Sequence, residues 1–274
     1  RSGLSRKNRE IAETVSPDIL VIGSSRAFYH YVPSIIEDSL GGSVYVAGEN
    51  GCGIVMMNPL LHYISARHKP DVVIYDMTPD LDFMDDDPHR YIKSARCLWG
   101  RNSYMDSVIC MVDPTERFKL HSRLFRFNSL PTRLIKDCIV PIYNIDRGYS
   151  PLYGKLDPQG QRIIHFDGTF ETSPLKLRLL KELIDFCRKN DIQLIFAISP
   201  YYGNSTENFS AYVSVIQKFG GRVLNFGSLE EISSPEYFND ACHLNHTGAC
   251  IYTDTLVSHI RRLQQTASRS GSKS

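Results

Sequence analysis

Short apolar runs separated by helical patterns are the feature that most restricts how this chain can fold. The runs are "PDILVIG" at 17–23, "GGSVYVAG" at 41–48, "KPDVVIYDM" at 69–77, "IQLIFAIS" at 192–199 and "RVLNF" at 222–226. Their length and their β-branched content are typical of buried strands. Parallel strands need a long crossover connection, so strands that alternate with helices favour a parallel sheet. We therefore predict an α/β fold with three layers, α/β/α, around a mainly parallel sheet of about five strands.

Helical spacing fills most of the intervals between these runs. The expected helices are 32–40, 55–68, Ser173 to Asn190, 209–219 and 246–263. Between about 81 and 170 the alternation of strand and helix stops, which indicates one largely helical insertion beside the core. The 274 residues are 42% hydrophobic, enough for one large core. We expect a single domain over 1–274, with a flexible tail at 266–274.

Composition excludes several classes of protein. The net charge is +1 and 22% of the residues are charged, so the balance does not indicate a nucleic-acid-binding protein. The basic residues near the ends of the chain, Lys7 among them, are expected to be solvated. Seven cysteines follow no tight spacing and do not indicate a disulfide framework. No run is apolar enough for long enough to span a bilayer.

Two serines directly follow the first expected strand, in "VIGSSRAF". Ligands gather at the carboxyl ends of the strands in open parallel sheets, so Ser24 and Ser25 would lie at the edge where sites form. The start of the next helix would supply backbone N–H groups to a developing oxyanion. The alternative is that one of these serines only caps that helix.

A second polar cluster, "NDACHLNHTG" at 239–248, precedes the last expected helix. Asp240 and His243 are three residues apart, so the carboxylate could reach one imidazole nitrogen while the other faces the strand ends. A serine nucleophile needs such a base, and the base needs a partner that fixes its tautomer. Asn245 could cap the following helix, and Gly248 would let its first turn pack closely.

The same cluster admits a zinc site built from Cys242, His243, His246 or Cys250. Zinc sites need three or four protein ligands, and no second Cys or His group at metal spacing occurs elsewhere. We therefore predict no metal and no other cofactor.

These motifs resemble those of the SGNH, or GDSL-type, serine hydrolase superfamily. The matching residues are Gly23-Ser24-Ser25 after the first strand and Asp240-Ala241-Cys242-His243 before the last helix, over about 1–80 and 172–265. The resemblance implies a flavodoxin-like SGNH fold with Ser25, His243 and Asp240 as catalytic residues. It also implies an oxyanion hole built from the backbone N–H groups of Ser25 and Gly51, with Ser24 and Asn50 adjacent to the substrate.

The third block of the family is different in this chain. Relatives place an Asn that donates to the oxyanion after the third strand, whereas "MTPDL" puts Asp80 there. An ionised carboxylate repels an oxyanion, so Asp80 must be protonated, turned away or replaced by another donor. Arg26 is a candidate for that donor; the alternative is a surface or salt-bridged arginine.

The resemblance implies a serine-dependent acyl-ester hydrolase or O-acyltransferase of a divergent cell-envelope branch. The expected substrate is an acylated carbohydrate or glycopolymer, with no nucleic-acid partner. The domain would be extracytoplasmic, held at the membrane only through an anchor ahead of Arg1. The alternative is a catalytically inactive SGNH-like module that binds or scaffolds envelope components. The insertion is expected to form one wall of the pocket.

Overall fold

The computed structural model describes residues 4–84, 95–127, 145–160, 163–166 and 171–271. Five parallel strands form one sheet in the order β2-β1-β3-β4-β5. They are β1 (Ile19–Gly23), β2 (Val44–Val46), β3 (Val72–Asp76), β4 (Gln193–Ile198) and β5 (Arg222–Asn225). All five expected strands are present, and this is the flavodoxin-like order. The predicted α/β/α fold is confirmed.

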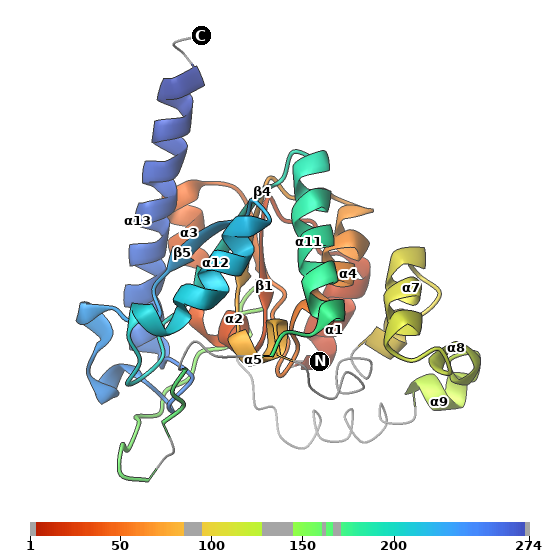
Figure 1. The fold of residues 1–274 in the computed structure, drawn as a ribbon, viewed down its shortest axis with the longest axis horizontal. Coiled ribbons are helices and arrows are strands. Elements are labelled where there is room, and N and C mark those ends of the chain that lie inside the picture. The colour runs from red at the N-terminus through yellow and green to blue at the C-terminus, as the bar shows by residue number, and fades with distance from the viewer. Residues whose placement is uncertain (1–3, 85–94, 128–144, 161–162, 167–170, 272–274) are drawn as a thin grey trace.

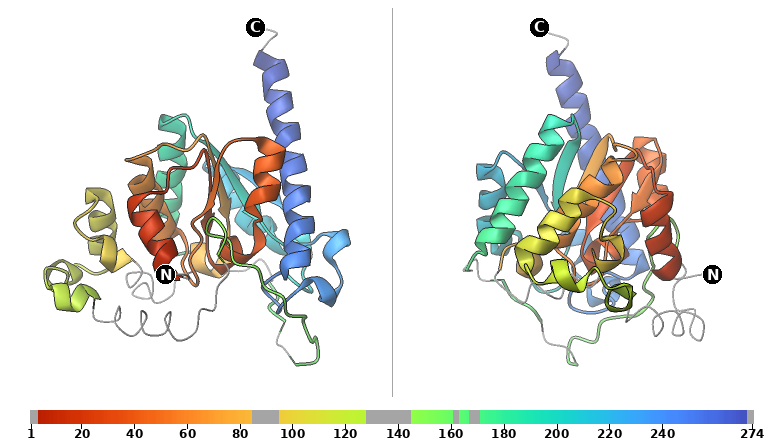
Figure 2. Two further views of the ribbon diagram at one scale, coloured as in Figure 1. Left: turned by 180° about the vertical axis from the view of Figure 1, so that it is seen from behind. Right: turned by 90° about the vertical axis from the view of Figure 1, so that its right-hand side faces the viewer.

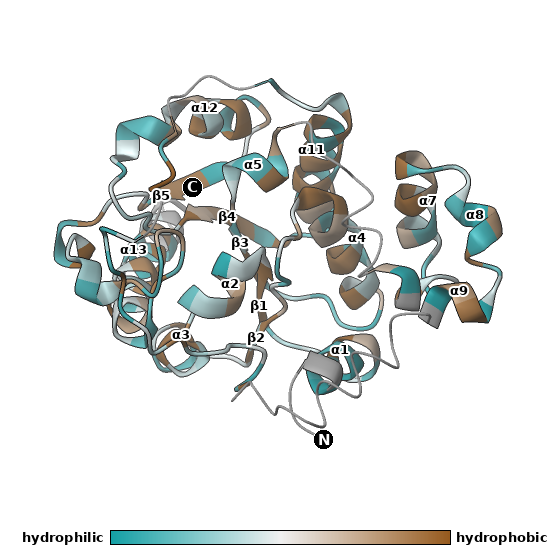
Figure 3. Cartoon of the chain, turned by 90° about the horizontal axis from the view of Figure 1, so that it is seen from below, coloured by the Kyte–Doolittle hydropathy of each residue, from teal (hydrophilic) through white to brown (hydrophobic). Residues whose placement is uncertain are grey.

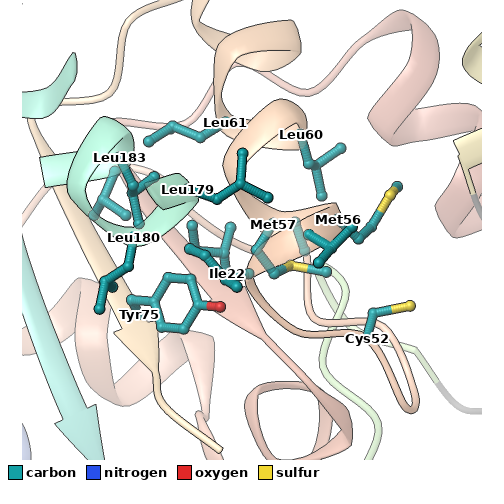
Figure 4. Packing of buried hydrophobic residues seen from close by; sticks show 14 of the residues in the cluster. Ile22, Cys52, Met56, Met57, Leu60, Leu61, Tyr75, Leu179, Leu180 and Leu183 are labelled. Carbon is teal, nitrogen blue, oxygen red and sulfur yellow. The ribbon is translucent and has the colours of Figure 1, made fainter. Parts of the chain in front are cut away.

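Helices cover both faces of the sheet (Figure 1). One face carries α1 (Leu4–Glu13), α4 (Ile54–Ser65), α11 (Pro174–Lys189) and α12 (Ser210–Lys218); the other carries α2 (Ser25–His30), α3 (Pro33–Leu40) and α13 (His246–Gly271). Successive β1 side chains alternate between the layers, as the period of a strand requires: Leu20 and Ile22 face α4, while Ile19 and Val21 face α13. Figure 4 shows Ile22 and Tyr75 of the sheet packed against leucines and methionines of α4 and α11.

The N-terminal segment is helical and buries a charged residue, which differs from the expected solvated end. Helix α1 packs Ile11 into the core, and Lys7 is only 1% exposed. The Lys7 ammonium donates to the carbonyls of Gly48 and Gly148 and lies over the ring of Phe28. Burial lowers the pKa of Lys7 to about 7, so its two carbonyl partners compensate only part of the lost hydration. A charge count cannot reveal this environment.

The insertion divides into two parts that lie in different places. Its first part is a group of short helices: η1 (Arg96–Leu98), α7 (Ser103–Val112), α8 (Glu116–Lys119) and α9 (Arg123–Phe127). Helix α7 packs against α4, and α8 and α9 lie farther from the sheet (Figure 1). The segment 145–157 instead crosses the carboxyl end of the sheet towards the start of α13 (Figure 2). Its backbone bonds Val46, Phe28, His246 and Phe238. This later part reaches the edge where the site was expected, unlike α7–α9 (Figure 3). Residues 85–94, 128–144, 161–162 and 167–170 lie outside the described residues.

The last helix is longer than its apolar stripe indicated. Helix α13 continues to Gly271, beyond Leu263 and into the segment expected to be a flexible tail. Its start matches the prediction, since the Asn245 side chain accepts from the Gly248 N–H, and a side chain at Gly248 would collide with the Tyr237 carbonyl. The remaining short elements are α5 (Pro79–Asp82), η2 (Thr206–Phe209), η3 (Glu230–Ile232) and η4 (Pro235–Tyr237). Over the described residues, no helix has both the length and the apolar character of a membrane span.

Candidate active site

The turn after β1 presents one serine to solvent and buries the other. Ser24 is the N-cap of α2 and is 1% exposed, with its hydroxyl 2.6 Å from that of Thr78. Ser25 is the first residue of α2 and is partly exposed. The turn requires Gly23, since its φ is +145° and a Cβ there would lie 2.6 Å from the Asp76 carbonyl oxygen. The capping role therefore belongs to Ser24, which leaves the Ser25 hydroxyl available.

Ser25, His243 and Asp240 meet although they come from opposite ends of the chain. The Ser25 Oγ lies 2.7 Å from His243 Nε2, and His243 Nδ1 lies 2.8 Å and 2.9 Å from the two carboxylate oxygens of Asp240. Nδ1 therefore carries the hydrogen that Asp240 accepts, and Nε2 can accept the proton of Ser25. This is the relation between nucleophile, base and orienting acid that activates a serine.

The turn that carries His243 folds around the Asp240 carboxylate. Asp240 Oδ1 also accepts from the backbone N–H groups of Cys242 and His243, and Oδ2 accepts from Asn239. Burial raises the pKa of Asp240, but the hydrogen bond and charge of His243 and these further donors outweigh it and lower the pKa to about 2. Asp240 is therefore ionised at neutral pH and can stabilise a protonated His243.

The loop after β2 approaches the same turn. A Cβ at Gly48 would lie 2.6 Å from the backbone nitrogen of Phe28, and the Glu49 N–H donates to the Gly23 carbonyl. Asn50 is exposed and donates to the Tyr29 hydroxyl, and the Tyr29 ring meets the edge of the His243 ring at 5.4 Å. Among the described residues, none accepts a hydrogen bond from the backbone N–H of Ser25 or of Gly51. Ser25 lies in the first turn of α2, where the backbone N–H groups have no partner within the helix.

Asp80 lies on the surface of the same edge. It is exposed, at the start of α5, and its charge acts on Tyr201 and on Cys242, the residue before His243. A carboxylate therefore does lie near the site at the position where the family places its Asn.

Asp82, which the sequence analysis did not single out, joins the two loops beside Ser25. Its buried carboxylate accepts from the N–H groups of Ile54 and Thr78 and from the Tyr75 hydroxyl, at 2.8, 2.6 and 2.6 Å. Burial raises the pKa of Asp82 to about 7, although these hydrogen bonds oppose the rise. The sequence feature that could have identified Asp82 was its position two residues after Asp80.

We expect the stability of the protein to depend on the charge of Asp82. Because the folded pKa is raised, the stabilising contribution is complete below the unfolded value of 3.8 and is lost as the pH rises through about 7. Asp82→Asn removes this titration. Urea unfolding at about pH 5 and pH 8 should show the wild type losing a few kcal/mol relative to Asp82→Asn. Parallel pH curves for the two proteins would contradict the assignment.

Arg26 does not lie where an oxyanion donor would be needed. Its side chain is 2% exposed, and its terminal nitrogens donate to the Ser199 hydroxyl, to the carbonyls of Ser199 and Pro200, and to the Cys242 carbonyl. An ion pair of 3.7 Å joins it to buried Asp76. The structure therefore supports the alternative of a salt-bridged arginine, which is buried behind the turn.

Both histidines considered for zinc are engaged in other contacts. His243 belongs to the contacts above, and His246 Nδ1 lies 2.9 Å from the Tyr149 hydroxyl. Within the described ranges, no three His, Cys, Asp or Glu side chains group as metal ligands. The described cysteines 52, 110, 187, 242 and 250 are free thiols.

No protein-family model matches the sequence, and no curated protein matches it. Two solved structures resemble the chain at 11% sequence identity. One is a proposed acylhydrolase from Bacteroides fragilis, with a TM-score of 0.45 over 95% of this chain and 97% of that one. The other is a proposed platelet activating factor protein from Streptococcus pneumoniae, with a TM-score of 0.40 over 93% and 89%. The resemblance to the SGNH fold rests on the sheet order and on the positions of the motifs along it.

Proposed function

We propose that the chain is a serine-dependent acyl-ester hydrolase or O-acyltransferase. The observation that carries this proposal is the 2.7 Å contact between Ser25 Oγ and His243 Nε2, with Asp240 on the other ring nitrogen. A neutral hydroxyl is a weak nucleophile until a positioned base takes its proton, and this arrangement supplies that base.

Ser25, His243, Asp240 and Gly51 have defined roles in the proposed reaction. Ser25 Oγ attacks the ester carbonyl while its proton passes to His243 Nε2, and Asp240 stabilises the imidazolium. The N–H groups of Ser25 and Gly51 receive the oxyanion, which collapses as His243 protonates the departing alkoxide. Water or a sugar hydroxyl, deprotonated by His243, then takes the acyl group from Ser25. The acceptor alone distinguishes hydrolysis from transfer.

The proposed substrate is an acylated carbohydrate or glycopolymer of the cell envelope, met by an extracytoplasmic domain. Support comes from the family resemblance and from Tyr153, which is 73% exposed on the segment beside the Asp240 turn. An exposed aromatic ring next to the site offers a flat apolar surface to the C–H face of a sugar.

A non-catalytic binding module is the competing function, and Asp80 is the observation that favours it. A fluorophosphonate probe separates the two, because it reacts covalently with an activated serine and leaves an inert one unmodified. We expect labelling of the wild type and none of Ser25→Ala. An unlabelled wild type with intact folding would overturn the enzymatic proposal.

Asp80→Asn is expected to leave ester turnover unchanged or to raise it. The substitution removes a negative charge from the site and supplies the neutral donor that relatives carry, and one such donor contributes about 10²–10³ in kcat at most. The measurement is kcat/KM on p-nitrophenyl acetate, with Asp80→Ala as the control that removes the charge without adding a donor. A large loss in both variants with an unchanged melting temperature would show that the carboxylate itself is needed.

A further inference from the structure

Two side chains of α2 bind the backbone on both sides of His243. Arg26 donates from one terminal nitrogen to the Cys242 carbonyl at 2.7 Å, and the Leu244 N–H donates to His30 Nε2 at 2.9 Å. The helix that begins with Ser25 therefore also holds the residues immediately before and after the base. The imidazole rings of His30 and His243 meet edge to face at 6.1 Å.

The hydrogen bonds of Ser199, at the end of β4, fix the tautomer of His30. The Ser199 hydroxyl lies 2.9 Å from His30 Nδ1, 2.7 Å from an Arg26 nitrogen and 2.7 Å from Asp76 Oδ2. A hydroxyl has one hydrogen, which goes to the carboxylate, and two acceptor positions, which receive Arg26 and the Nδ1–H of His30. His30 Nε2 is then the unprotonated nitrogen that the Leu244 N–H requires.

This network is buried, and burial keeps His30 neutral. His30 and Asp76 are 0% exposed. Burial, followed by the charges of Arg26 and His243, keeps the pKa of His30 well below its ordinary value, so the ring is neutral at neutral pH. Arg26 also lies 3.4 Å above the centre of the Tyr201 ring. Side chains enclosed and bonded in this way have little freedom to shift.

We propose that Arg26 and His30 are positioning residues that hold the His243 imidazole in line with the Ser25 hydroxyl. The inference rests on the proposed function and extends it, because it makes the nucleophile's own helix the support of the base. Misplacement of a catalytic group by about 1 Å can reduce a rate by about 10²-fold. Loss of either backbone contact should therefore reduce kcat and leave KM nearly unchanged, because neither side chain is exposed to substrate.

His30 offers a matched pair of substitutions. The terminal amide of His30→Gln lies near the position of Nε2 and can accept from Leu244, whereas that of His30→Asn lies near Nδ1 and keeps only the Ser199 contact. We expect His30→Asn to lower kcat on p-nitrophenyl acetate about 10–100-fold, and His30→Gln to restore most of it. Deuterium exchange of the Leu244 amide should be at least about tenfold faster in His30→Asn than in His30→Gln.

Arg26→Lys tests the other contact while keeping a positive charge beside Asp76. An ammonium cannot bond Ser199 and Cys242 simultaneously in the geometry of a guanidinium, so kcat should again fall about 10–100-fold. Arg67→Lys is the control, because Arg67 also binds backbone carbonyls and lies over a tyrosine ring, but does so at Ile11, Ala12 and Tyr63. It should retain wild-type kcat.

Three results would decide the matter against the proposal. Wild-type kcat in both His30→Asn and Arg26→Lys would overturn it, as would equal losses in His30→Asn and His30→Gln. Exchange of the Leu244 amide that is as slow in His30→Asn as in the wild type would also overturn the proposal. This exchange measurement does not depend on ester turnover. A wild type that neither reacts with the fluorophosphonate nor cleaves the ester would instead overturn the proposed function, so the two failures are distinguishable.

Discussion

Ser25→Ala and His243→Ala are each expected to lower kcat on p-nitrophenyl acetate by at least about 10⁴-fold, because each removes half of the unit that makes a nucleophile at neutral pH. Ser25 Oγ and His243 Nε2 are 2.7 Å apart, so neither acts without the other. The double variant should therefore be no slower than the slower single variant.

The fold should tolerate both changes. Ser25 is partly exposed at the first position of α2, and the cap of that helix belongs to Ser24. The melting temperature should stay near that of the wild type. Ser107→Ala is the matched control, since Ser107 is an exposed helical serine on α7 whose hydroxyl donates to the Ser103 carbonyl. Turnover by Ser25→Ala at more than a few per cent of the wild-type rate would show that another group performs the reaction.

Asp240→Asn is expected to lower kcat by about 10⁴-fold with little change in KM. The carboxylate accepts from His243 Nδ1 and from the N–H groups of Cys242 and His243, and a neutral amide can neither accept as many hydrogen bonds nor stabilise the imidazolium. The Asn amide would also favour the tautomer with its hydrogen on Nε2, which cannot take the proton of Ser25.

The matched control for this variant is Asp185→Asn. Asp185 pairs with Arg188 at the same three-residue spacing as Asp240 and His243, but on the exposed face of α11. Asp185→Asn should keep full activity.

The folded pKa of Asp240 is about 2, so its stabilising contribution is present above the unfolded value of 3.8 and is lost as the pH falls through about 2. Acid unfolding of the wild type should therefore begin at a lower pH than that of Asp240→Asn, which never ionises. Unfolding that begins at the higher pH in the wild type would contradict this assignment.

The sequence predicted the strands and the meeting of Ser25 with His243 because both depend on local patterns. Buried runs mark strands, and polar residues after them lie at a shared edge. The same rule could have found Asp76, the last residue of β3, and Ser199, which directly follows β4. His30 and Arg26 gave no such signal, because their roles depend on what packs behind α2. The sequence left Arg26 open between an oxyanion donor and a salt-bridged arginine, and its burial and its ion pair with Asp76 favour the second.

Lys7 and the segment 145–157 show a second limit of prediction from the sequence. Burial of Lys7 depends on the carbonyls of Gly48 and Gly148, which lie far from it in sequence. The segment 145–157 has no helical or strand periodicity, and its position follows from backbone contacts with Phe28, Phe238 and His246. Figure 3, which views the strand ends, shows α2 near the centre of this edge and α7–α9 well to one side. Long-range contacts of this kind are invisible to any local rule.

The attachment of α2 to the turn before α13 has a consequence for biosynthesis. Ser25 emerges from the ribosome 218 residues before His243, which lies between Cys242 and Leu244. Contacts across such a separation form late, because the chain must first close a long loop. A nascent chain that ends before Asp240 would hold its serine without a base, and Arg26 and His30 without their backbone partners at Cys242 and Leu244. Reactivity should thus arise only after the turn that carries Asp240 and His243 has been made, so a product truncated before this turn would be unreactive as well as incompletely folded.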